Sequence, residues 1–112
     1  MDDLFLKIID KEIPANIIFE DEDILAFEDI NPQAPTHILI IPKKHIAKLS
    51  DADISDQKLL GHRWIKANEI AANLKLDNTF RLVINNGANA GQSVFHLHMH
   101  ILSGRSFSWP PG

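Results

Sequence analysis

The sequence predicts an α+β domain in which a five-stranded antiparallel sheet is accompanied by one short and one long helix. Two observations point to this class. A short helical pattern, three strand-like segments, a long helical stripe and two further strand-like segments follow one another along the chain. The loops between successive strands are short, which favours antiparallel neighbours. We expect one domain over residues 1–112, because this length suits a single hydrophobic core.

The first half of the chain is predicted to form a short helix, a hairpin and a third strand. Apolar residues recur at helical spacing over 4–9, and Pro14 ends the pattern because the residue before a proline is pushed toward extended geometry. Apolar segments at 17–20 and 24–28 flank an acidic turn and predict the hairpin. A proline-containing loop precedes the β-branched run 36–41, which predicts the third strand.

The second half is predicted to contain the long helix and the last two strands. The helix is expected from Ser55 to Leu74, with Asp53 or Ser55 as its cap, because apolar positions step by four and three along one face. The positions of this stripe are Leu60, Trp64, Ala67, Ala71 and Leu74. Strands are expected at 80–85 and 94–102, separated by a loop of small residues.

The composition argues against several classes of protein. A net charge of -4, with one tight basic cluster at Lys43-Lys44-His45, offers no broad surface for nucleic acid. No apolar run approaches the ~20 residues of a membrane span. The first residues are acidic where a secretory signal would be basic, and the absence of cysteine rules out disulfides and thiolate chemistry. We therefore expect a cytoplasmic protein with no nucleic-acid or membrane partner.

The strongest indication of function is a row of three histidines near the C-terminus. His96, His98 and His100 alternate with apolar residues, and successive side chains of a strand point to opposite faces. The three imidazoles therefore share one face, roughly 6 to 7 Å from one another. A neutral imidazole offers a lone pair near pH 7 and becomes a donor once protonated, so a pair of histidines can divide nucleophile and acid roles.

The loop that leads into this row is a candidate phosphate site. Its small residues over 87–91 let backbone N–H groups approach an anion, and the side chains of Gln92 and Ser93 would add donors. Such a loop is usually a plain connection. Its position beside the histidines makes the functional reading the better one.

Metal binding is the competing interpretation of the histidine row. An HxH pair on a strand can present two nitrogen ligands to zinc, copper or iron, but three residues in a straight row diverge, so a further ligand would be expected. His37 and His45 are the spare candidates, and no carboxylate lies close to them in sequence. His37 is also compatible with a hydrogen-bonded core residue, and His45 and His62 with solvated positions.

Motifs spread over nearly the whole chain resemble those of the histidine-triad (HIT) superfamily, whose signature is His-x-His-x-His followed by apolar residues. The other matching segments are Lys11-Glu12-Ile13-Pro14-Ala15, Ile18-Phe19-Glu20-Asp21, Pro32-Gln33-Ala34-Pro35-Thr36-His37, Ile41-Pro42-Lys43-Lys44-His45, Leu59-Leu60-Gly61-His62, Asn85-x-Gly87, Gly91-Gln92-Ser93-Val94 and Trp109-Pro110-Pro111-Gly112. The Gly-Gln-Ser segment and the tail resemble the Hint branch more than the dinucleoside-polyphosphate-cleaving Fhit branch.

The resemblance implies a purine nucleoside phosphoramidase that cleaves the P–N bond of adenosine or guanosine 5'-monophosphoramidates and releases AMP or GMP and an amine. It implies no metal and no other cofactor. His98 would attack phosphorus and form a nucleotidyl-histidine. His100 would bind the non-bridging oxygens, and His37 and His96 would orient the reacting ring. The leaving amine needs a proton, and the path to it, through Ser93 or a neighbouring histidine, stays open.

The resemblance also implies the nucleotide contacts and the assembly. The expected phosphate and ribose contacts are Asp29, Ile30, Asn85, Gly91, Gln92 and Ser93, together with His98 and His100. The expected lining of the base pocket is Ile13, Phe19, Phe27, Ile30 and Leu39. A five-stranded antiparallel meander sheet would pair with a second copy through the long helix and the fourth strand. Trp109 would then reach toward the partner's site.

Two other function classes stay open on the sequence alone. One is a metallohydrolase that uses the histidine row. The other is a nucleotide-binding regulatory protein in which catalysis is incidental.

Overall fold

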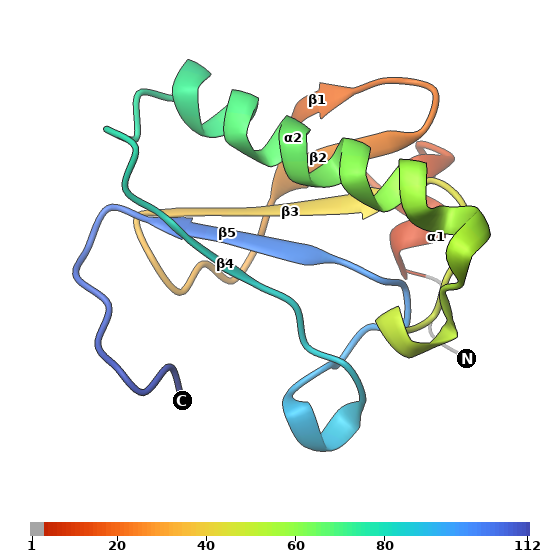
Figure 1. Ribbon diagram of the computed structural model, residues 1–112. Helices are drawn as coiled ribbons and strands as arrows, with labels where there is room; N and C mark the ends of the chain where they lie inside the picture. Colours follow the sequence, from red (N-terminus) through yellow and green to blue (C-terminus); the bar gives the residue numbers. More distant parts are fainter. Residues whose placement is uncertain (1–3) are drawn as a thin grey trace.

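The computed structural model describes residues 4–112 (Figure 1). The helices and strands of this range are α1 (Leu4–Ile9), β1 (Ile17–Glu20), β2 (Ile24–Glu28), β3 (Thr36–Pro42), α2 (Gln57–Asn73), β4 (Arg81–Val83) and β5 (Met99–Ser103). Short 3₁₀ turns occur at Leu49–Asp51, Ile54–Asp56 and Ala88–Ala90. The expected α+β class with a five-stranded antiparallel sheet is confirmed. The acidic residues at 2 and 3, which entered the expectation about export, lie outside the described range.

The order of the strands in the sheet is β1-β2-β3-β5-β4. The first three strands form the expected meander, but the meander is wrong in its last step. β5 pairs with β3, so the last strand of the chain lies inside the sheet and β4 lies at its edge. The reason is the connection: α2 carries the chain across the sheet, so the strand after it is not bound to pair with β3.

The sheet separates two apolar cores. α2 lies across one face (Figure 1), where it packs on alternate residues of β2, β3 and β5. The side chains of this core are Ile24, Ala26, Ile38, Ile40, Ala67, Ile70, Met99 and Ile101. α1 covers part of the opposite face with a smaller core, which consists of Phe5, Ile8, Leu25, Phe27, Leu39 and Ile41. The histidine row belongs to this second face.

The buried row of α2 differs from the predicted stripe. Ala67 and Ala71 are buried as expected, but Trp64 is 49% exposed and Leu74 is 40% exposed. The buried row instead includes Arg63 and Ile70. A helix on the outside of a single sheet buries only a narrow row of side chains, and Trp64 lies beside that row.

Asp53, one of the two expected cap residues, caps the 3₁₀ turn Ile54–Asp56 that leads into α2. The side chain of Asp53 accepts from the backbone N–H of Ser55, and the side chain of Asp56 accepts from the backbone N–H of Asp53, which makes a reciprocal capping box for the 3₁₀ turn. α2 then begins at Gln57.

β5 is shorter than the strand expected at 94–102, because the chain before Met99 leaves the regular ladder. This stretch is attached to the last residue of β3 and to the segment that follows β3 by hydrogen bonds outside the ladder. Leu97 N–H donates to Ile46 O at 2.6 Å, and His96 Nε2 donates to Pro42 O at 2.6 Å. The alternation of side chains continues through this stretch, since Leu97 and Met99 are fully buried on one side while His96 and His98 contact Phe5 on the other.

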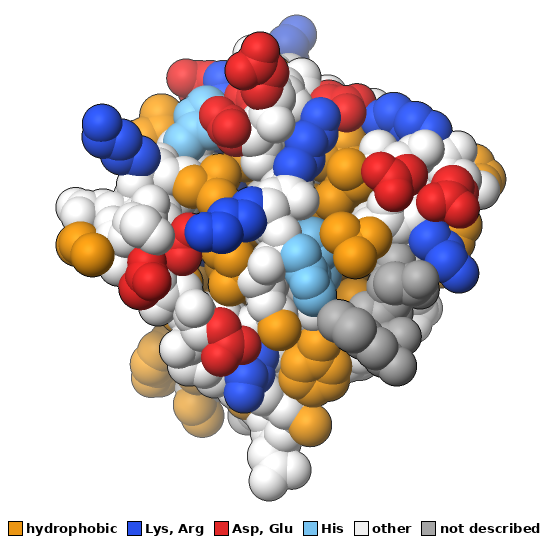
Figure 2. Space-filling model, turned by 90° about the vertical axis from the view of Figure 1, so that its right-hand side faces the viewer, with side chains coloured by type: hydrophobic (Ala, Val, Ile, Leu, Met, Phe, Trp, Pro, Cys, Tyr) orange, Lys and Arg blue, Asp and Glu red, His pale blue; other side chains and the backbone are white. Residues whose placement is uncertain are grey.

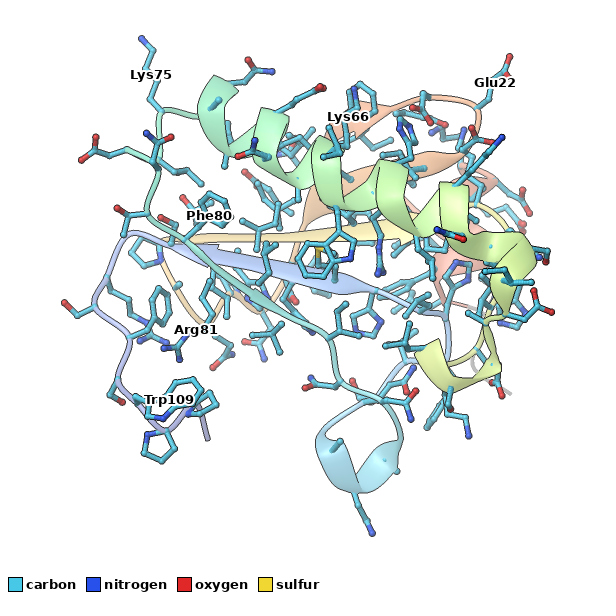
Figure 3. The ribbon with its side chains drawn as sticks, viewed as in Figure 1. Glu22, Lys66, Lys75, Phe80, Arg81 and Trp109 are labelled. Atoms are coloured by element: carbon cyan, nitrogen blue, oxygen red, sulfur yellow. The ribbon has the colours of Figure 1, made fainter. Side chains whose placement is uncertain are left out.

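The C-terminal tail after β5 is attached to β4 by Arg81. Arg81 Nη2 donates to Ser108 O at 3.0 Å, and the guanidinium groups of Arg81 and Arg105 both contact the Phe107 ring, at 5.2 and 4.3 Å from its centre. Figure 3 shows Arg81 reaching toward the tail and Trp109 near its end. The Trp109 side chain is 83% exposed, and its reach toward the site of a partner subunit stays a prediction.

Two surface properties bear on the excluded classes. None of the helices in residues 4–112 has both the length and the apolar character needed to cross a bilayer. On the face shown in Figure 2, basic and acidic side chains are interspersed, and neither sign forms a continuous area.

Two glycines form a matched pair for testing the packing beneath the loop that precedes β3. Gly104 has a φ of +96°, and a Cβ there would lie 2.8 Å from Cβ of Pro35, whereas a Cβ at Gly61 in α2 would meet nothing within 4 Å. We expect Gly104→Ala to lower the free energy of unfolding by roughly 1–3 kcal/mol. Gly61→Ala should raise it by roughly 0.5–1 kcal/mol. Urea unfolding followed by circular dichroism measures both, and equal effects would contradict the packing described.

Candidate active site

A cavity of about 540 Å³ opens on the α1 side of the sheet. Its walls come from α1, the segment 13–15, the loop between β2 and β3, and the histidine row. One end is apolar, with Phe5, Ile8, Phe27 and Leu39 among its lining residues. The other end is polar and is lined by Asp29, His37, Ser93, His98 and His100. A concave site with an apolar end and a few convergent polar groups suits a ligand with an aromatic part and a charged part.

The register of β3 and β5 brings histidines from distant parts of the chain together. Leu39 pairs with His100 and His37 pairs with Leu102, so all four side chains point to the α1 face and the two histidines are diagonal neighbours. Their rings are 5.1 Å apart between centroids. The His98 ring follows at 5.0 Å from that of His100 and packs edge-on against Phe5 at 5.2 Å.

The hydrogen-bond partner of His98 determines its tautomer. Nδ1 of His98 lies 2.8 Å from the carbonyl oxygen of His96. A carbonyl oxygen can only accept, so Nδ1 carries the proton and Nε2 of the neutral ring keeps its lone pair. His98 therefore presents an unprotonated nitrogen beside the cavity, which is the state required of a nucleophile.

His37 and His100 form a directed chain with the opposite result. The backbone N–H of Gln33 donates to Nδ1 of His37 at 3.0 Å, so the proton of the neutral His37 ring is on Nε2. Nε2 of His37 lies 2.8 Å from Nδ1 of His100, which must accept. The proton of the neutral His100 ring is therefore on Nε2, and His100 is a donor where His98 is an acceptor.

Burial keeps these rings neutral at physiological pH. It lowers the pKa of His98 below its ordinary value, and the positive charge of Arg63 adds to this effect. Burial, with the neighbouring His98 and His37, lowers the pKa of His100 to about 4. The pKa values of His37 and His96 are also lowered, mainly by burial.

The loop before the histidine row has the backbone that close approach to an anion requires. Gly87 and Gly91 have φ values of +95° and +100°, which favour glycine, and they flank the 3₁₀ turn Ala88–Ala90. Gly91 and Ser93 line the cavity. The expected side-chain donor of Gln92 points elsewhere: its Nε2 donates to Ala47 O and Val94 O, while its Oε1 accepts from Gly87 N–H. The Gln92 side chain therefore stabilises the loop through backbone groups and does not point a donor into the cavity.

Most of the expected site residues are gathered around the cavity. The lining includes His37, His98, His100, Ser93, Gly91, Asp29, Ile30, Ile13, Phe27 and Leu39. Ile30 is 94% exposed. Asp29 accepts from the backbone N–H of Asn31 through Oδ1, and its Oδ2 lies 3.5 Å from Nε2 of His37.

Four expected residues lie outside the lining. Phe19 packs against the α2-side core and under the ammonium group of Lys66 at 4.6 Å, so its place in the base pocket is wrong. A residue of β1 on that face cannot also reach the α1 side of the sheet. His96 lies behind His98 and bonds to Pro42 O, and Asn85 lies beneath Gly91. Gln92 is the fourth.

Sequence reasoning missed the contribution of α1 to the cavity. Leu4, Phe5 and Ile8 line it, and Phe5 also contacts the His98 ring. The signal was present, because the helical spacing over 4–9 defines one apolar face, but that face was assigned only to the core.

The remaining histidines have structural partners. Nε2 of His62 lies 2.7 Å from Oδ2 of Asp21, which also caps the turn between β1 and β2. His45 is exposed, bonds to Phe95 O at 3.1 Å and lies 5.1 Å from the His96 ring. Neither lines the cavity.

Within residues 4–112, Asp29, His37 and His100 form a group that could hold a cation, since their ligand atoms lie within 4.8 Å of one another. The sequence did not show this group, because Asp29 approaches His37 only through the fold of the loop before β3. A cation on Nε2 of His37 would require a proton on Nδ1, which faces the N–H donor of Gln33. The donor arrangement thus suits a shared proton better than a metal.

Comparison with known proteins agrees with this architecture. The HIT domain family model matches residues 10–107. A HIT-like protein of Synechocystis sp. is 61% identical over 111 residues, covering 99% of this chain and 97% of that protein. The crystal structure of a HIT family hydrolase from Legionella pneumophila is 52% identical with a TM-score of 0.95, covering 97% of this chain and 98% of that chain. A histidine triad nucleotide-binding protein from Candida albicans is 34% identical with a TM-score of 0.82, covering 97% and 83%.

The family model spans most of the chain, two relatives of known structure superimpose over nearly its whole length, and His98 and His100 of the histidine row line a cavity. On this evidence the chain belongs to the HIT-domain family.

Proposed function

We propose that this protein is a hydrolase of the Hint type, a purine nucleoside phosphoramidase that releases AMP or GMP and an amine through a covalent nucleotidyl-histidine. We also propose that it works in the cytoplasm, as one domain and without a cofactor. One observation carries the proposal: the His98 ring, whose Nε2 is unprotonated, lies 5.0 Å from the His100 ring, whose Nε2 carries a proton, in a cavity with an apolar end.

The cavity suits a nucleoside monophosphate in one orientation. A purine fits the apolar end between Phe5, Phe27 and Leu39, and the ribose hydroxyls can donate to Asp29. The phosphate then lies at the polar end, near Ser93 and the histidines.

The chemistry follows from the tautomers. When Nε2 of His98 forms a bond to phosphorus and the P–N bond breaks, the His98 ring becomes cationic. The bond from its Nδ1–H to the carbonyl of His96 then becomes charge-assisted and stabilises the intermediate. His100 donates through Nε2–H to a non-bridging phosphate oxygen.

Departure of the amine needs a proton, and hydrolysis of the nucleotidyl-histidine needs water. The amine departs only if it takes up a proton, and the Ser93 hydroxyl lies in the same cavity as the reacting rings. Water then attacks the nucleotidyl-histidine and regenerates His98, releasing the mononucleotide.

The names of two related structures support this assignment. The Legionella pneumophila protein is described as a hydrolase and the Candida albicans protein as nucleotide-binding. Both properties are required of a nucleotidyl hydrolase.

The proposal includes a homodimer built through α2 and β4. β4 lies at the edge of the sheet, and Trp64 and Ile65 of α2 are 49% and 63% exposed. A second copy would cover these side chains and extend the sheet across the edge. The exposed Trp109 could then reach the partner's cavity.

Two rival activities give different outcomes. A metallohydrolase would lose activity in a chelator and contain about one metal per chain. A nucleotide-binding regulatory protein would bind AMP and yield no nucleotidyl-histidine after rapid acid quench.

We expect His98→Ala to lose turnover of adenosine 5'-phosphoramidate by roughly 10³-fold or more, because the covalent nucleophile is removed. AMP binding, measured by calorimetry, should persist because the apolar end and Asp29 are intact. His62→Ala is the matched control, since His62 bonds to Asp21 away from the cavity. Retained turnover in His98→Ala would contradict the assigned nucleophile.

The pH profile tests the protonation state of His98. Its folded pKa is lowered from 6.5 by burial, and only the neutral ring has a lone pair to attack. The value of kcat/KM should therefore be at its plateau at pH 7 and fall on acidification, with a midpoint below pH 6.5.

Arg63→Met should move this acidic limb to higher pH, because the Arg63 charge contributes to lowering the pKa of His98. If the midpoint of the acidic fall in kcat/KM lay above pH 6.5 in the unmodified protein, it would contradict the statement that burial lowers the pKa of His98.

Sedimentation equilibrium tests the dimer. The unmodified protein should run at about twice the chain mass of 12.6 kDa, and Trp64→Glu should run at the chain mass because it buries a charge in the interface. Ile54→Glu changes an 82% exposed side chain outside α2 and β4 and should leave the mass unchanged. A monomeric unmodified protein would refute this interface.

A further inference from the structure

We propose that Arg105 is a positioning residue, which holds the loop before β3 so that the Gln33 N–H fixes the proton of His37 and, through it, that of His100. The kinetic part of this proposal rests on the proposed function, and the structural part does not. Arg105 lies in the tail after β5, outside the cavity lining.

Arg105 connects the tail to the loop by a direct hydrogen bond. Its Nε donates to the carbonyl oxygen of Gln33 at 3.1 Å. Nη1 donates to Ser106 O at 3.0 Å, and the guanidinium group lies 4.3 Å from the centre of the Phe107 ring. The guanidinium group of Arg105 is therefore held by Ser106 O and the Phe107 ring while its Nε–H donates to the loop.

Gln33 passes this contact on to the histidines. Its own N–H donates to Nδ1 of His37, and its side chain bonds within the loop to Asn31 O at 3.0 Å. Within residues 4–112 the third bond of Gln33 is the one from Arg105. The loop has no regular secondary structure, so the direction of the Gln33 N–H depends on these contacts.

The direction of the Gln33 N–H decides whether Nε2 of His100, the nitrogen that faces the phosphate, carries a proton and can donate. If the Gln33 N–H turns away, His37 can place its proton on Nδ1, and Nε2 of His37 then accepts. His100 would respond with a proton on Nδ1 and a lone pair on Nε2. A lone pair at that position repels a phosphate oxygen where a donor attracts it.

The tail offers a matched control in Arg81. The guanidinium group of Arg81 lies 5.2 Å from the centre of the Phe107 ring and donates to Ser108 O, so Arg81 also holds the tail. Among the hydrogen bonds of residues 4–112, the one to the carbonyl of Gln33 comes from Arg105. Figure 3 shows Arg81 approaching the tail from β4. Loss of Arg81 therefore loosens the tail, whereas loss of Arg105 also removes the bond to the loop.

The decisive experiment is ¹⁵N NMR of the imidazole nitrogens in the full-length protein without ligand. The unmodified protein should show His37 and His100 each protonated at Nε2. Arg105→Met should shift both toward a mixture of tautomers. Arg105→Lys should do the same, since an ammonium cannot supply the Nε–H of the guanidinium group. Arg81→Met should keep the unmodified pattern.

Binding of AMP gives the second readout. Arg105→Met should weaken it about three- to tenfold, the range expected for loss of one hydrogen bond, and should raise KM more than it lowers kcat. Arg81→Met should change it less than twofold. Unmodified ring tautomers in Arg105→Met overturn the proposal, and so do equal effects of the two variants. Failure to turn over any phosphoramidate would refute the proposed function and leave the NMR result valid.

Discussion

The site depends on the hydrogen bond from Nδ1 of His98 to the carbonyl of its own neighbour, His96. This bond needs no other side chain, so the backbone of the segment before β5 is enough to assign the tautomer. In the proposed reaction, the same carbonyl that orients the ring would also face the charge that develops on it. In His37 and His100 the proton is on the other ring nitrogen, Nε2. This tautomer is set by the backbone N–H of Gln33 in the loop before β3, which donates to Nδ1 of His37. Two independent sets of backbone groups thus make neighbouring imidazoles chemically different.

The two faces of the sheet have different roles: the α2 face carries the larger apolar core, and the α1 face carries the cavity. α2 and its face supply the larger apolar core, while α1 buries only a few side chains and leaves room for the cavity. Burial on the α1 side is still sufficient to lower the pKa of every histidine around the reaction centre. Phe5 links both tasks, because it packs on Phe27 in the core and edge-on against His98.

The sequence predicted local patterns well and long-range choices less well. Strand limits at 17–20 and 24–28 agree with β1 and β2, because alternation and the acidic turn are local signals. The place of β5 between β3 and β4 depends on how α2 crosses the sheet, and no local pattern records that path. Two site residues were misplaced for a similar reason. The residue type shows which contacts a side chain can make, but Gln92 bonds to Ala47 O and Phe19 packs on the α2-side core, and both partners are distant in sequence.

The interior position of β5 has a consequence for the order of folding. In the sheet of residues 4–112, β4 pairs with β5 alone, so β4 cannot join the sheet before β5 pairs with β3. Until then one edge of β3 lacks its partner, and the buried isoleucines Ile38 and Ile40 have no cover from Met99 and Ile101. A chain in which β5 has not yet joined the sheet therefore exposes an unpaired strand edge and lacks His100 beside His37. Pairing of β5 both covers this edge and brings the two histidines together.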